Sequence, residues 1–109
     1  MTDSHHRFDV LRGALDADVS DEAVAEMIER SCELELFRGQ VLVERGDPYR
    51  EWFVVLEGRV EVRDASGRRE LVAAGTVMDI GEHEVWTVMA TAIEASTVLA
   101  IAVPEAEPA

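Results

Sequence analysis

The residues best suited to bind a metal form the run Glu82-His83-Glu84, because carboxylate and imidazole groups are common metal ligands. Successive side chains of a strand point to opposite faces, so His83 would face away from the two glutamates. His5 and His6 stand near the N-terminus, where we expect a mobile segment in solvent. The sequence therefore predicts no metal site.

The chain offers no candidate centre for nucleophilic or acid–base catalysis. Cys32, its single cysteine, cannot form an intramolecular disulfide, and we expect it to be a small buried core residue. No pattern typical of a Ser/His/Asp or Cys/His centre is present, and no Gly-rich phosphate loop. We therefore predict no catalytic residues and no enzymatic activity.

Composition limits the partners of this 109-residue chain. It has 23 acidic and 10 basic side chains, which give a formal net charge of −13. Such a charge repels the phosphate backbone of a nucleic acid, and no apolar run approaches the roughly 18 residues that a membrane span needs. We therefore expect one cytoplasmic domain that binds neither nucleic acid nor membrane.

The pattern of apolar residues predicts helices first and strands afterwards. Apolar residues at helical spacing occur over 8–15, and Ser20 is a candidate N-cap for a second helix that ends near Arg30. From Cys32 to Leu36 the apolar period changes to two, which is typical of a half-buried strand. Further β-rich runs, separated by turn-forming glycines, cover residues 41–45, 52–57, 59–63, 69–74 and 97–103.

Many short strands without intervening helices favour a sandwich, a barrel or a jelly roll. Pro104 cannot continue a sheet, so the ordered domain should end near Val103. We therefore expect a flexible N-terminus over 1–7, one domain over 8–103 and a flexible tail over 104–109.

The glycine-punctuated strands are similar to those of a known family. Residues 37–47 (FRGQVLVERGD), residues 52–62 (WFVVLEGRVEV) and Gly75 resemble the cyclic nucleotide-binding domain family, and the resemblance spans residues 8–103. It implies a mainly β fold, a jelly-roll-type β-roll (a double-stranded β-helix) with short N-terminal helices. Gly58, between two strand-like runs, fits a tight hairpin corner that requires a positive φ.

In that family, a Phe-Gly-Glu-like triplet begins the cassette that holds the nucleotide. Its Glu binds the ribose hydroxyl, and an Arg about nine residues later pairs with the cyclic phosphate. Counted without gaps from Gly75, the ligand-binding candidates are Met78, Asp79 and Ile80 for the triplet, Met89 for the arginine, and Ala90 and Thr91 after it.

A rival alignment takes Gly81 and Glu82 as the Gly-Glu pair, after a two-residue insertion. It restores a ribose-binding Glu but no cation, because the sequence has no Lys or Arg after Gly75. A buried phosphate without a cation loses its charge-assisted partner. We therefore expect a degenerate cassette, no cofactor, and disfavoured binding of cyclic nucleotides.

The apolar run over 85–90 lies where the family places its phosphate-binding loop. In one interpretation the run folds inward, and Trp86 and Met89 replace the nucleotide. In the other, an apolar patch or pocket mouth for a partner protein or a hydrophobic small ligand is formed by Val85, Trp86 and Val88. The sequence does not decide between them.

The chain ends where transcription regulators of the family continue into a long helix and a helix-turn-helix, so we expect another chain to supply any output. The favoured function is a stand-alone regulatory or protein-interaction module, acting with another protein chain or as a homo-oligomer. The alternative is a sensor domain that binds a small ligand, such as a cyclic nucleotide, in the cavity of the roll.

Overall fold

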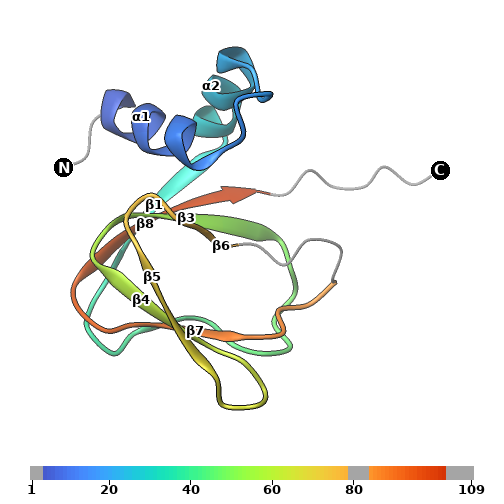
Figure 1. The fold of residues 1–109 in the computed structure, drawn as a ribbon, viewed down its shortest axis with the longest axis vertical. Coiled ribbons are helices and arrows are strands. Elements are labelled where there is room, and N and C mark those ends of the chain that lie inside the picture. Colours follow the sequence, from blue (N-terminus) through green and yellow to red (C-terminus); the bar gives the residue numbers. More distant parts are fainter. Residues whose placement is uncertain (1–3, 79–83, 103–109) are drawn as a thin grey trace.

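The computed structural model describes residues 4–78 and 84–102. Two helices lie on one side of a roll made from two antiparallel sheets (Figure 1). This arrangement confirms the predicted fold class, a mainly β roll with short N-terminal helices.

The helices are α1 (Ser4–Ala14) and α2 (Asp21–Glu29). The predicted N-cap of α2 is confirmed, because the Ser20 hydroxyl accepts a hydrogen bond of 3.1 Å from the Ala23 N–H. α1 begins upstream of the predicted helix start at Phe8, so both His5 and His6 lie in a helix.

Each sheet has four strands, and all pairings within the sheets are antiparallel. The first sheet has the order β1-β8-β3-β6, formed by Ser31–Leu36, Ser96–Ala102, Glu51–Glu57 and Val77–Met78. The second has the order β2-β7-β4-β5, formed by Val41–Val43, Met89–Ala92, Arg59–Arg63 and Arg69–Ala73. Because the two sheets face each other, alternate residues of every strand point into the roll.

The central strands of the first sheet are buried on both faces. In β3, Phe53 and Val55 pack between the sheets, whereas Val54 and Leu56 pack against the helical layer, where they meet Leu11. This double burial explains why β3 is a continuous apolar run and not an alternating one. The helices therefore cover the outer face of the first sheet.

Two predictions about single residues have opposite outcomes. Gly58 has a φ of +88° between β3 and β4, which confirms the tight hairpin corner. The prediction that Cys32 is buried is wrong, because its side chain is exposed. β1 is an edge strand, and its inward-facing residues become less buried from Leu36 through Leu34 to Cys32.

β8 ends at Ala102. Val103, the predicted end of the domain, and the tail over 104–109 lie outside the described residues.

Candidate functional site

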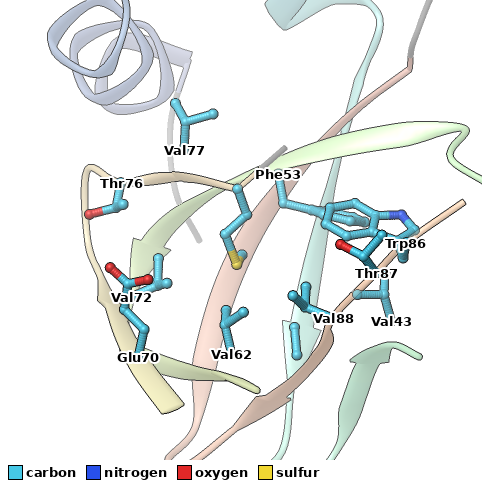
Figure 2. A pocket seen from close by; sticks show the side chains of 12 residues that line it. Val43, Phe53, Val62, Glu70, Val72, Thr76, Val77, Trp86, Thr87 and Val88 are labelled. Carbon is cyan, nitrogen blue, oxygen red and sulfur yellow. The ribbon is translucent and has the colours of Figure 1, made fainter. Parts of the chain in front are cut away.

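A cavity of about 560 Å³ lies between the two sheets (Figure 2). Both sheets and the segment before β7 contribute to its wall. The lining residues are Val43, Phe53, Val62, Glu70, Val72, Thr76, Val77, Met78, Trp86, Thr87, Val88 and Ala90. The volume is in the usual range of small-molecule sites, about 300–1,000 Å³.

Trp86 forms one end of the cavity and is only 3% exposed. Its ring meets Tyr49 edge-on at 5.5 Å and lies 5.7 Å from the ring of Phe53. Its backbone is held on both sides, since its N–H donates to the Asp47 carbonyl and its carbonyl accepts from the Gly46 N–H, each at 2.8 Å. Trp86 is therefore a fixed part of the wall.

The side chains of the apolar run over 85–90 do not all point to the same side. Val85 is 44% exposed, Trp86 is buried, and Val88 is half-buried and lines the cavity. The three candidates for partner contact therefore form no common apolar patch. Trp86 has folded inward, as the first interpretation requires, but the run leaves an open cavity.

β7 places the residues of the gap-free alignment on two different faces. Ala90 and Ala92 are buried in the roll core, whereas Met89 and Thr91 are half-buried and do not line the cavity. Because side chains of a strand alternate, Met89 and Thr91 lie on the opposite face. Met89, to which the gap-free count assigns the phosphate-binding position, therefore does not line the cavity, whereas Val88, immediately before β7, does.

The other cassette candidates are only partly placed. Met78 is buried and lines the cavity. Asp79, Ile80, Gly81 and Glu82 lie outside the described residues.

Polar side chains are few in the described wall. They are the carboxylate of Glu70 and the hydroxyls of Thr76 and Thr87. Figure 2 shows Glu70 and Thr76 on one side of the cavity, and Trp86 with Thr87 on the other. No Lys or Arg belongs to the part of the wall that the structure describes.

A smaller hollow of about 260 Å³ adjoins the cavity, and the two share Val62, Glu70 and Val88. Asp64 and Arg68 complete its lining. The Asp64 carboxylate accepts a hydrogen bond of 2.6 Å from the Ser66 hydroxyl, and further bonds from the backbone N–H groups of Ser66 and Arg68. The Ser66 hydroxyl is the main reason why the pKa of Asp64 is lowered.

Sequence reasoning missed most of the wall. The residues not anticipated are Val43, Phe53, Val62, Glu70, Val72, Thr76, Val77 and Thr87. Six of them lie on five strands and the two threonines lie between strands, so the alternation of each strand and the sheet order would both be needed to identify them.

Within residues 4–78 and 84–102, no three His, Cys, Asp or Glu side chains form a group that could hold a metal. Neither of the two described helices is long and apolar enough to cross a membrane.

The model of the protein family described as Cyclic nucleotide-binding domain matches residues 33–106, which is more than half of the chain. The chain belongs to this family. No curated protein matches the sequence.

Solved structures of other domains have the same fold as this cyclic nucleotide-binding domain. The N-terminal domain of a transcriptional regulator from Streptomyces coelicolor is 32% identical, with a TM-score of 0.70, over 86% of this chain and 74% of that one. The sensor domain of the transcriptional regulator DNR from Pseudomonas aeruginosa has a TM-score of 0.77 at 15% identity, over 87% of this chain and 73% of that one.

The regulatory domain of Toxoplasma gondii PKA, whose structure contains cAMP, also has a TM-score of 0.77 at 15% identity. The match covers 94% of this chain but only 43% of the Toxoplasma chain. At this identity the likeness shows a shared fold.

Proposed function

We propose that this domain is a regulatory module that binds a small, largely apolar ligand in the cavity of the roll. We further propose that its cassette is degenerate and does not hold a cyclic nucleotide by the contacts typical of the family. The observation that supports both statements is the chemistry of the wall, in which nine of the twelve described lining residues are apolar and none is basic.

A cyclic phosphate is an anion, and its transfer from water into an apolar cavity is costly unless a cation or several donors receive it. The only charged side chain in the described wall is Glu70, which would repel it. The sequence also has no Lys or Arg after Arg69, so no later segment can supply a basic group other than His83.

An apolar ligand, in contrast to a phosphate, gains free energy when it moves from water into this cavity. Val88 and Ala90 stand on the wall near the place where the family pairs its nucleotide phosphate, and Trp86 and Phe53 supply aromatic surface. Burial of apolar ligand surface against such walls contributes about 25 cal/mol for each Å² removed from water. A ligand without a phosphate therefore fits this wall better than a cyclic nucleotide does.

In its regulatory role, the domain would act on another protein chain or on a second copy of itself. A ligand would reach Trp86 and Val88 through the cavity, whereas of the three partner candidates only Val85 is exposed. We therefore expect a ligand to act first on the segment that precedes β7.

Two titrations of the full chain test the proposal. In calorimetry, cyclic AMP and cyclic GMP should give no saturable binding below about millimolar concentration. The neutral fluorescent probe N-phenyl-1-naphthylamine should bind saturably, and Val88→Trp should weaken this binding by filling the cavity. Met89→Trp, which adds the same ring on the opposite face, is the matched control and should leave it unchanged. Micromolar binding of cyclic AMP, or equal effects of the two variants, would contradict the proposal.

A further inference from the structure

Glu70 occupies an inward-facing position of the second sheet. In the register of this sheet it lies opposite Val62 on β4, and Val62 lies opposite Ala90 on β7. All three residues line the cavity, so they form one row across its wall. Glu70 thus places a carboxylate on the cavity-facing side of β5, an edge strand of its sheet.

This carboxylate has no ionic partner in the described part of the chain. The ion pairs there join Arg7 to Glu33, Arg12 to Asp21, Arg59 to Glu94, and Arg63 to Glu61. Glu70 is also exposed to solvent while it faces the cavity. An unpaired charge at the mouth of an apolar cavity is a natural contact for a ligand group of opposite sign.

The arginine of the adjoining hollow does not reverse the charge of the cavity wall. Arg68 lines the adjoining hollow with two carboxylates, those of Asp64 and Glu70. The Ser66 hydroxyl lowers the pKa of Asp64, which favours the charged form of this carboxyl. The hollow therefore has one positive and two negative side chains.

A third hollow, of about 310 Å³, shares Val43, Phe53 and Trp86 with the cavity. Its charged lining residues are Asp47, Arg50 and Glu51, again one arginine with two acids. In each of these two hollows the charged lining residues thus sum to a net negative charge.

The far side of the cavity can hold the apolar part of the same ligand. Figure 2 shows Glu70 and the indole of Trp86 on opposite sides. Phe53 lies beside Trp86, and together they offer aromatic surface to an apolar or aromatic body. The cavity is therefore complementary to a molecule that is apolar at one end and positively charged at the other.

We infer that the ligand of this cavity is a small organic cation, such as an ammonium with an apolar or aromatic body, and that Glu70 binds its charged group. The inference rests on the proposed function, since it names the class of ligand for the same cavity. It also reverses the charge of the ligand relative to a cyclic nucleotide.

Three probes with one apolar body test this inference: phenylbutylamine, phenylbutanol and phenylbutyrate, which are cationic, neutral and anionic at neutral pH. Binding is followed by the fluorescence of Trp86 in a Trp52→Phe background, because Trp52 packs in the helical layer and not at the cavity. We expect the amine to bind about threefold to fivefold more tightly than the alcohol, and the carboxylate to bind most weakly.

Glu70→Gln should remove the difference between the amine and the alcohol. Glu57→Gln changes the net charge equally at an exposed position of β3 outside the cavity, and it should preserve the difference. A preference that survives Glu70→Gln would overturn the inference and leave Glu70 only as a charge that protects an edge strand. Equal binding of all three probes would also overturn it, while the apolar cavity of the proposed function would stand. Failure of every probe to bind would contradict both proposals.

Discussion

Gly58→Ala is expected to be one of the most destabilising small substitutions in the roll. Gly58 joins β3 to β4 at a φ of +88°, and an added Cβ would lie 2.2 Å from the Ser96 hydroxyl and 2.7 Å from the Ala95 carbonyl. The carbonyl belongs to the backbone, so a side-chain rotation alone cannot relieve the collision. Either the hairpin or the start of β8 must move.

Two costs add at this position. A left-handed backbone at a non-glycine residue costs about 1–2 kcal/mol. Displacement of Ser96 also breaks its buried hydrogen bonds, since its hydroxyl accepts from the Arg59 N–H at 3.1 Å and donates to the Glu94 carbonyl at 2.9 Å. An unsatisfied buried group costs about 1–3 kcal/mol. The total, about 2–5 kcal/mol, corresponds to a melting temperature lower by roughly 10 °C or more.

Thermal melts followed by circular dichroism measure this effect, and Gly67→Ala is the matched control. Gly67 has a φ of +89°, but an added Cβ there has no atom within 4 Å. It should therefore incur the backbone strain alone, about 1–2 kcal/mol. Equal losses of melting temperature in the two variants would refute the argument that the contact with Ser96 distinguishes Gly58.

Three further predictions concern the cap, a turn and the cassette. Ser20→Ala should lower the free energy of unfolding by about 1 kcal/mol in urea titrations, whereas Ser20→Asp, which can still cap α2, should not. The pKa of Asp64 lies below 3.8, so its carboxylate stabilises the fold above that pH and loses this effect as the pH falls through the folded value. Asp64→Ala should thus melt at a lower temperature than the parent near neutral pH. In acid, the two melting temperatures should be closer together. Val88→Arg should increase the affinity for cyclic AMP in calorimetry, whereas Met89→Arg should not. A higher affinity in Met89→Arg than in Val88→Arg would show that the faces of β7 are misassigned.

The strands could be predicted from the sequence where turn-forming residues bound the alternating pattern of apolar residues. Residues 59–63 match β4 at both ends, because Gly58 precedes the strand and Asp64 begins the next turn. β6 was missed, since two residues have no period to detect. The register of a strand within its sheet is set by contacts distant in sequence, so it was beyond the reach of local patterns.

Cys32 shows the same limit within a strand that was predicted correctly. The alternating pattern identified the face that Cys32 shares with Leu34 and Leu36, but not how far along that face the core extends. Burial depends on the neighbouring layer, and an edge strand has fewer neighbours. The cavity wall was unpredictable for a related reason, because its twelve described residues meet only after both sheets close.

The assignment of the cassette depends on a single residue of register. Val62 lies opposite Ala90, and Arg63 lies opposite Met89. Since Val62 and Ala90 line the cavity, the other pair must face outward, and a shift of one residue in the alignment moves the predicted binding position from one face to the other. The row that contains Ala90 and Val62 ends at Glu70. In that row a carboxylate is the only charged group, and this is the observation from which we propose a cationic ligand.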